Sequence, residues 1–481
     1  MSATEKQGEA YSSPYSFHGR IPLSQAIPLG LQHVMAMFVG NLTPVIIVMG
    51  ACGLTADAGF GELRTALLQN AMLVAGLITL IQLFSIGPCG GKVPIVMGTS
   101  SGFLGVFQSV AATLGGGVLS YGAILAASLL GGLFEGLLGA FLKPLRRFFP
   151  PVVTGVVVMS IGMSLLSVGI NYLCGGNGAR DYGSAANLCL GLFVLVVILV
   201  LKHFFNPKGM VSTASVLLGI IAGYLAAVVM TLTLPTTGMA ADGTEFTYSW
   251  AVNFQQVANA GWLSLPRIIG LGVLSDVRLV FAPAAIFPVM IMFVVTAVET
   301  IGDISAVIEG GMDREPTDRE LSGGVICDGL GSSLATLFGV LPNTSFSQNV
   351  GLVSMTKVVN RYAISMGALF LILCGLCPKV GALVSIMPQS VLGGAAVMMF
   401  ASIMVSGIQL ITKHPIGARE ITIVSVALGL GYGIGATAAA TSALPYYLQL
   451  IFGGSGIVPA ALVAIALNII LPENDGKQPS E

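Results

Sequence analysis

Long apolar runs, separated by short polar breaks, fill almost the whole chain. A helix needs about 20 apolar residues to cross a bilayer, and fourteen runs are candidates for such spans. Seven of them lie at 28–50, 66–86, 94–112, 118–141, 151–170, 187–203 and 213–234. Seven more follow a polar stretch at 235–279 and lie at 280–301, 321–340, 343–358, 360–377, 381–408, 418–436 and 441–471. This pattern predicts an all-α membrane protein with fourteen transmembrane segments.

The composition agrees with this class and disfavours several others. Of the 481 residues, 55% are hydrophobic and 9% are charged, whereas about 25% are charged in soluble domains. The mean hydropathy of +0.91 and the 63 glycines are typical of closely packed membrane helices. A net charge of −1 provides no basic stripe for a nucleic acid. A soluble enzyme, a disordered chain and a nucleic-acid binder are therefore disfavoured.

The basic residues test the span count independently, because cytoplasmic loops of membrane proteins carry an excess of Lys and Arg. With a cytoplasmic N-terminus and strict alternation, only five of the 20 basic residues fall on the outer side. These five are Arg64, Arg180, Arg267, Arg278 and Lys379. The asymmetry predicts two cytoplasmic termini and an extracytoplasmic loop at 235–279. The first 27 residues lack the apolar run of a signal peptide, so we expect no cleaved signal.

Two halves of seven spans each would form an inverted repeat, because an odd number makes the second half enter from the opposite side. Two pairs of short segments support this arrangement. The stretches 93–101 and 341–349 fall in the third span of each half, and each begins with an apolar residue and Pro before it becomes polar. The stretches 151–155 and 388–393 likewise open the fifth span of each half.

The third and tenth spans contain polar tracts that are costly in lipid unless they face protein or a cavity. Pro94 and Pro342 lack a backbone donor and favour an extended start. We therefore expect each span to be a short extended piece followed by a half-helix that starts near the bilayer midplane. Two oppositely directed extended pieces could pair, and the half-helix starts would offer N–H groups to a ligand. The side chains expected there are Ser100, Ser101, Ser347, Gln348 and Asn349. The alternative is two ordinary helices with polar residues packed inside the bundle.

A second group of candidates is ionisable. Glu299 and Asp303 are four residues apart, so both carboxyl groups share one helix face. Asp328 stands in the next span and His33 in the first. A buried acid that is protonated from one side and deprotonated to the other is what proton coupling requires. The alternatives are a hydrogen-bonded core histidine at position 33 and a surface acid at position 303, if the membrane ends there.

Three other features leave this picture unchanged. Glu135 lies between Gly132 and Gly136, and the sequence does not decide between close helix packing and a transport role. Cys374 and Cys377 have CxxC spacing but lie in an apolar run without a second Cys or His pair, so we expect packing and no metal site. The chain has no Walker lysine motif, so we expect no use of ATP.

The segment 348–357 resembles the signature motif of the nucleobase–ascorbate transporter family, also called the uracil/xanthine permeases. That motif has Gln, Glu or Pro, then Asn, any residue and Gly, then four residues, Thr and often a basic residue. Here it reads Gln348-Asn-Val-Gly-Leu-Val-Ser-Met-Thr-Lys357. The stretch 299–303 and the pair Gln32-His33 are also similar to family elements. The resemblance covers roughly residues 28–471.

The resemblance implies a core domain of spans 1–4 and 8–11 and a gate domain of spans 5–7 and 12–14, which also forms a homodimer. The core is expected to move against the gate in an elevator-like alternation. The corresponding parts of this chain are a cytoplasmic tail at 1–27, core segments at 28–141 and 280–377, gate segments at 151–234 and 381–471, an extracytoplasmic loop at 235–279 and a cytoplasmic tail at 472–481.

The resemblance also implies roles for individual residues. Glu299 matches the glutamate that hydrogen-bonds the base, and Gln348 matches the first motif residue, which does likewise. Backbone groups at Ser101 and Ser347 would complete the substrate site. The positions linked to proton coupling, or to holding the geometry of the site, are Asp303, His33 and Asp328.

The substrate indicated by the resemblance is an oxidised purine, xanthine or uric acid. Family members that carry uracil tend to have Glu where Gln348 stands, and a neutral amide both donates and accepts, which suits a purine edge. Ser100 departs from the Asn of some xanthine-selective members, which loosens a strict xanthine assignment. We expect proton-coupled uptake across the inner membrane, with no cofactor, no metal and no enzymatic activity. The alternatives are a uracil or other nucleobase symporter and an anion exchanger of the same architecture.

Overall fold

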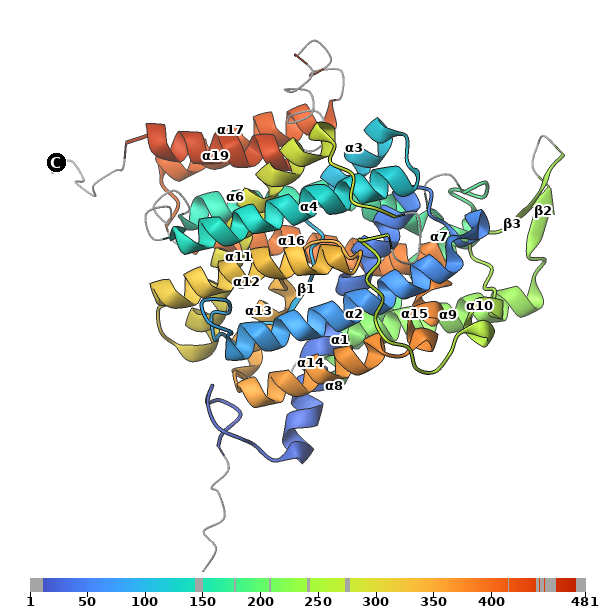
Figure 1. The fold of residues 1–481 in the computed structure, drawn as a ribbon, viewed down its shortest axis with the longest axis horizontal. Coiled ribbons are helices and arrows are strands. Elements are labelled where there is room, and N and C mark those ends of the chain that lie inside the picture. Colours follow the sequence, from blue (N-terminus) through green and yellow to red (C-terminus); the bar gives the residue numbers. More distant parts are fainter. Residues whose placement is uncertain are drawn as a thin grey trace, which may run out of the picture.

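The computed structural model describes residues 12–142, 150–176, 179–206, 209–239, 243–272, 277–413, 415–437, 441, 445 and 456–472. In this part of the chain, helices dominate and two short antiparallel ribbons are the only sheets. Figure 1 shows the long helices stacked roughly parallel to one another in a single bundle. Most apolar runs of the sequence are therefore helices packed against other helices.

The first half of the chain contains the following elements: α1 (Leu23–Ala51), the π-helical turn η1 (Ala56–Phe60), α2 (Gly61–Phe84), strand β1 (Met97–Thr99), α3 (Leu104–Leu114), α4 (Gly117–Ala140), α6 (Pro151–Leu173), α7 (Ala185–His203), α8 (Met210–Thr213) and α9 (Ser215–Thr233). The polar loop at 235–279 is partly ordered and contains β2 (Thr237–Met239), β3 (Glu245–Thr247) and α10 (Gln255–Asn259).

The second half contains α11 (Pro283–Met312), α12 (Asp318–Leu337), strand β4 (Asn343–Ser345), α13 (Ser347–Thr356), α14 (Arg361–Gly375), α15 (Pro378–Ser385), α16 (Gln389–Ile411), α17 (Ala418–Ala436) and α19 (Ile457–Ile470). Eight described helices are long and apolar enough to cross a membrane, or nine if the pair α14 and α15, bent by 81°, is one span. The fold is that of a multi-pass membrane protein, and the count of fourteen spans stays a prediction.

Most observed helix ends differ from the expected ones by a few residues, and three differences change the picture. Helix α11 does not end at 301 but continues to Met312, which places Asp303 inside the helix. The expected span 381–408 is interrupted, because α15 ends at Ser385 and α16 starts only after Pro388, which is extended and has no amide hydrogen to donate. The half-helix expected near Ser101 begins at Leu104, after a turn. Of the expected span 441–471, most residues before 456 lie outside the described part of the chain.

The two extended pieces predicted in the third and tenth spans are strands β1 and β4, and they pair. The ribbon is antiparallel, with Met97 opposite Ser345 and Thr99 opposite Asn343. All six residues are buried. This arrangement confirms the paired extended pieces and contradicts the alternative of two ordinary helices.

The outer edges of this ribbon are satisfied by polar side chains of the neighbouring helices, since an unpaired backbone group is costly in a membrane interior. On the β1 edge, the backbone N–H of Met97 donates to Thr79 Oγ1 at 2.9 Å. That of Thr99 donates to Asn41 Oδ1 at 2.8 Å. On the β4 edge, the N–H of Asn343 donates to Ser332 Oγ at 3.0 Å, and the Ser332 hydroxyl donates back to the Asn343 carbonyl. The three helices α1, α2 and α12 therefore fix the position of the ribbon.

Glycine allows helices from the two halves of the chain to approach closely. A Cβ atom at Gly329 of α12 would lie 2.3 Å from the backbone nitrogen of Gly136 in α4. A Cβ atom at Gly407 of α16 would lie 2.4 Å from the backbone nitrogen of Met159 in α6. Each contact leaves no room for a side chain. The pairs α4–α12 and α6–α16 thus join the first half of the chain to the second.

Candidate functional site

A small pocket lies where the β1–β4 ribbon meets α11. Its volume is about 20 Å³, which is enough for about one water molecule. The residues that line it come from six elements or their connections: Thr99, Ser101, Gly102, Ile161, Glu299, Thr344, Ser345, Phe346, Ser347, Gln348 and Ile403. Four of the predicted substrate residues, Glu299, Gln348, Ser101 and Ser347, are therefore brought together in space.

Glu299 presents an unsatisfied carboxyl oxygen to this cavity. Its side chain is 6% exposed, and Oε2 has no hydrogen-bond partner among the described residues. A Cβ atom built on Gly102 would lie 3.8 Å from Oε2, so the carboxyl group faces the turn between β1 and α3. A buried carboxyl oxygen without a partner is costly, and a ligand with an N–H group would satisfy it.

Asp303 joins α11 to the ribbon. It is 5% exposed, and its Oδ2 accepts hydrogen bonds from Ser345 Oγ at 2.7 Å and Ser347 Oγ at 3.0 Å. Because Ser347 is the first residue of α13, these bonds fix the start of that half-helix. The interpretation of Asp303 as a surface acid is wrong, since α11 continues past it.

Asp328 likewise joins α12 to α11 and β4 through hydrogen bonds. Its side chain is fully buried on α12, and its Oδ2 accepts hydrogen bonds from the hydroxyl groups of Thr300 and Thr344, the latter at 3.4 Å. Thr300 also lies 3.5 Å from the hydroxyl of Ser345. The carboxyl groups of Asp303 and Asp328 are thus connected through hydroxyl side chains of α11 and β4.

Ser100 and Asn349 are placed behind the cavity and do not line it. The side-chain amide of Asn349 donates to the backbone carbonyl of His33 at 3.0 Å and lies 3.4 Å from His33 Nδ1. Ser100 donates its backbone N–H to the Pro342 carbonyl at 2.8 Å, and its Oγ accepts from the N–H of Gly102 at 3.2 Å. Ser100 thus holds the connection between β1 and α3, and Asn349 holds the first turn of α13. Both segments carry residues that line the cavity.

A larger cavity of about 1100 Å³ adjoins the small one and shares Ser347 and Gln348 with it. Its far end is lined by Lys202, His203, Glu309 and Lys413. The ammonium group of Lys413 forms an ion pair with Glu309, which links the end of α16 to α11. The candidate site therefore opens toward the end of the molecule where the sequence predicts the cytoplasm.

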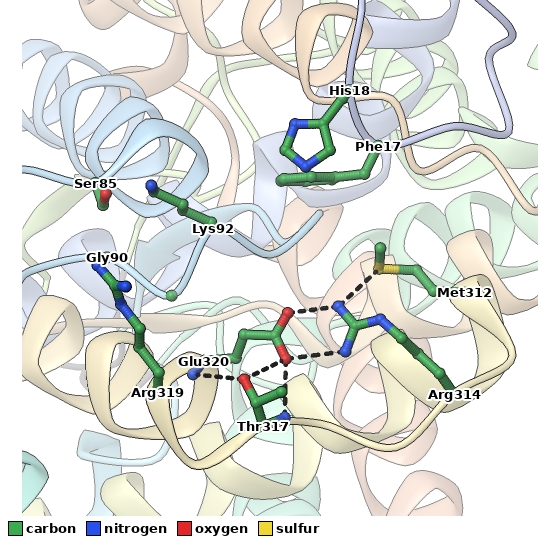
Figure 2. A pocket seen from close by; sticks show the side chains of 11 residues that line it. Phe17, His18, Ser85, Gly90, Lys92, Met312, Arg314, Thr317, Arg319 and Glu320 are labelled. Carbon is green, nitrogen blue, oxygen red and sulfur yellow. Dashed lines mark hydrogen bonds and ion pairs between the residues drawn. The ribbon is translucent and has the colours of Figure 1, made fainter.

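A further hollow of about 440 Å³ lies at the end of the bundle where α11 is followed by α12. Figure 2 shows Glu320 hydrogen-bonded to Arg314 and Thr317, with His18, Lys92 and Arg319 around the same space. Thr317 and Glu320 form a capping box that starts α12. Burial alone would raise the pKa of Glu320, but hydrogen bonds from Arg314 and from Thr317 outweigh it and lower that pKa.

The sequence did not indicate the apolar residues of the site. Ile161 of α6 and Ile403 of α16 close the cavity opposite Glu299, but each lies in an ordinary apolar run. Phe346 could have been found from its place between Ser345 and Ser347 in the tract that breaks the tenth span. In the part of the chain that the structure describes, no group of three His, Cys, Asp or Glu residues could hold a metal ion.

Comparison with known proteins gives matches over almost the whole chain. The Permease family model for xanthine/uracil permeases matches residues 24–439. A provisionally named purine permease of Clostridium perfringens strain 13 is 35% identical over 460 residues, which cover 96% of this chain and 93% of that protein. Uric acid permease PucK of Bacillus subtilis is 34% identical over 445 residues, which cover 92% of this chain and 95% of that protein. Xanthine permease XanP of Escherichia coli K12 is 31% identical over 475 residues, which cover 95% of this chain and 94% of that protein.

Solved structures with the same fold have much lower identity. The transmembrane domain of the cyanobacterial bicarbonate transporter BicA matches with a TM-score of 0.50 at 16% identity, over 93% of this chain and 98% of that one. The structure of SLC26A9 matches with a TM-score of 0.57 at 9% identity, over 93% of this chain and 64% of that one. At this identity the likeness shows a shared fold only, that of a helical membrane transporter.

Proposed function

Because this chain belongs to the nucleobase–ascorbate transporter (uracil/xanthine permease) family, we propose that it takes up xanthine, uric acid or both, together with protons. As a member of that family the protein is a transporter and not an enzyme. The substrate class rests on the relatives, which are named as purine, uric acid and xanthine permeases.

The observation that carries this proposal is the unpartnered Oε2 of Glu299 in the small cavity that also contains Gln348. A carboxylate accepts hydrogen bonds from ring N–H groups, and a side-chain amide can donate to a carbonyl and accept from an N–H. An oxidised purine offers both kinds of group along one edge. Ile161 and Ile403 supply apolar surface for the faces of the ring.

Substrate entry requires the site to expand, since about 20 Å³ holds one water molecule and no purine. The polar lining is on α11, on α13 and on strands β1 and β4 with the residues that follow them, whereas Ile161 and Ile403 are on α6 and α16. A displacement of the first set of elements relative to the second would open the cavity. We therefore propose the elevator-like movement of a core (28–141 and 280–377) against a gate (151–234 and 381–471).

Proton coupling is proposed from the buried ionisable groups. Asp303 lines the larger cavity and is connected to Asp328 by hydroxyl groups, and His33 is held by Asn349. A charge that is buried at membrane depth is costly, so uptake and release of a proton there can be linked to movement. The energy source is then the proton gradient and not a cofactor.

The remaining proposals concern the setting of the protein. The plasma membrane is proposed from the family, and two cytoplasmic termini from the distribution of basic residues. A homodimer through the gate is proposed from the family resemblance; α7 and α9 expose apolar side chains to lipid or to a partner, among them Phe193, Val196, Leu225 and Val229. The molar mass of the detergent-solubilised protein, measured by light scattering, tests the dimer; a monomer mass would contradict it.

Uptake by proteoliposomes tests the transport proposal. Labelled xanthine should accumulate when the interior is more alkaline than the outside, and a protonophore should abolish this accumulation. Competition by urate, hypoxanthine, guanine and uracil then ranks the substrates. Accumulation that survives the protonophore would contradict proton coupling, and strong competition by uracil alone would favour the nucleobase alternative.

An anion exchanger is the second candidate, because the solved structures of like fold include a bicarbonate transporter. Half-helix starts such as that of α13 favour anions. The buried carboxyl group of Glu299 beside this start opposes an inorganic anion, which makes the purine the better candidate. Displacement of bound xanthine by sulfate or bicarbonate would reverse this order.

A further inference from the structure

Glu135 is a buried acid that has no part in the substrate cavity. It lies near the end of α4, its side chain is fully buried, and it does not line either cavity of the site. The glycines around it explain the close packing of α4 on α12: a Cβ atom at Gly132 would lie 2.5 Å from the carbonyl oxygen of Gly329. The packing motif therefore accounts for the glycines and leaves the carboxyl group of Glu135 without a role.

The hydrogen bonds around Glu135 indicate the form in which it is held. Its Oε1 lies 3.2 Å from Thr296 Oγ1, and its Oε2 has no partner. Thr296 Oγ1 also lies within 3.3 Å of the carbonyl oxygens of Met292 and Phe293, and one hydroxyl has one hydrogen to give. The one hydrogen of Thr296 is thus divided between Oε1 of Glu135 and two carbonyl oxygens, and a buried carboxyl group whose charge is stabilised so little favours the protonated form.

The groups that face Glu135 from the helices packed against it are also acids. Helix α11 contributes Glu299, three residues after Thr296, and α12 contributes Asp328; α3 has no ionisable side chain. Oε2 of Glu299 and Oδ1 of Asp328 are unpartnered like Oε2 of Glu135. No cation is paired with any of the three in the described residues. Because like charges oppose one another in a dry environment, the three carboxyl groups must share their protons as one set.

We propose that Glu135 is a proton-binding site separate from the substrate cavity, and that it exchanges its proton when substrate changes the charge of Glu299. This inference rests on the proposed function. Glu135 is the member of the set that never touches substrate. It stores a proton that Glu299 and Asp328 gain or lose.

A route between this set and water is present on the side of the larger cavity. Asp303 lines that cavity and accepts from Ser345 at 2.7 Å. Ser345 lies 3.5 Å from Thr300, which donates to Asp328. Thr296 and Thr300 are one helical turn apart on the same face of α11. These side chains lead from the set toward the larger cavity, past Ser345, which also lines the substrate cavity.

Infrared spectroscopy of the purified protein tests the proton site without any transport. Difference spectra between two pH values, recorded without substrate, should contain a carboxylic-acid C=O band that Glu135→Gln removes and Glu135→Asp keeps at a shifted position. Ser128→Ala is the matched control, since Ser128 is another fully buried α4 residue with an unpartnered side-chain oxygen; it should leave the band unchanged. Identical spectra of wild type and Glu135→Gln would overturn the proposal.

Transport by the same variants tests the coupling. In proteoliposomes, Glu135→Gln should exchange xanthine at no less than about a third of the wild-type rate but lose about tenfold or more of its gradient-driven accumulation. Thr296→Val removes the one side-chain hydrogen bond that Glu135 has within the described part of the chain. It should shift the pH profile of accumulation and serves if Glu135→Gln does not fold. A wild-type pH profile in both variants would overturn the coupling. Failure of the wild type to move any purine would instead overturn the proposed function, while the pH-induced band would still be measurable.

Discussion

The side-chain amide of Asn349, in α13, donates a hydrogen bond to the backbone carbonyl of His33, in α1, across 3.0 Å. Both residues are buried. The bond joins the tenth predicted span to the first and holds the residue that follows Gln348. Asn349 of the signature motif therefore does not line the cavity but holds α13, which carries Gln348, against α1.

Asn349→Ala should slow uptake and destabilise the protein modestly. Loss of one buried hydrogen bond costs about 0.5–1.5 kcal/mol, and the start of α13 would lose its tie to α1. Thermal unfolding in detergent and initial uptake rates check both effects. Asn259→Ala, the same truncation in an exposed helix of the outer loop, is the control; equal effects of the two changes would contradict the role of Asn349.

Glu299→Gln should weaken purine binding while the protein still reaches the membrane. A hydrogen bond to a charged acceptor contributes about 1.5–3 kcal/mol, which corresponds to a Kd roughly 10- to 100-fold higher. Equilibrium binding of labelled xanthine to the purified variant measures the change. Glu315→Gln makes the same chemical exchange in an exposed loop and should bind like the wild type. Wild-type affinity in Glu299→Gln would remove this residue from the site.

Gly329→Ala should lower the melting temperature, because its Cβ would meet backbone atoms of Gly132 and Gly136 at 2.5 and 2.3 Å. Overpacking of this kind costs about 1–3 kcal/mol. Gly429→Ala is the matched control in α17, since no atom lies within 4 Å of its Cβ position. The control should be neutral or slightly stabilising. Equal melting temperatures for the two variants would mean that α4 and α12 can move apart at Gly329 without loss of stability, which would contradict the prediction.

The ion pair between Arg314 and Glu320 should contribute to stability in a pH-dependent way. The pKa of Glu320 is lowered in the folded protein, so the contribution is present above the unfolded value of about 4.3 and is lost as the pH falls through the folded value. Arg314→Ala removes the pair, in which Arg314 donates to Glu320 Oε2 at 3.0 Å. The difference in melting temperature between wild type and variant should therefore be constant above about pH 5 and shrink as the pH falls below about 4.3. A constant difference would mean that Arg314 acts by packing alone.

The sequence was informative wherever a pattern of neighbouring residues determines the local structure. Runs of apolar residues marked most of the membrane helices, and the combination of Pro342 with a polar tract located strand β4 and the start of α13. The signature motif identified Gln348, and the spacing of Glu299 and Asp303 placed them on one face of α11. Each of these inferences depends on residues close together in the chain.

The sequence by itself determined that this is a helical membrane transporter with two broken segments and buried acids beside them. Only the tertiary structure decided which side chains meet. It placed Asp303 inside the bundle because α11 continues to Met312, it turned Asn349 toward His33, and it closed the cavity with Ile161 and Ile403. These relations join segments that are far apart in the chain, and a local pattern of polar and apolar residues is the same whether such segments touch or not.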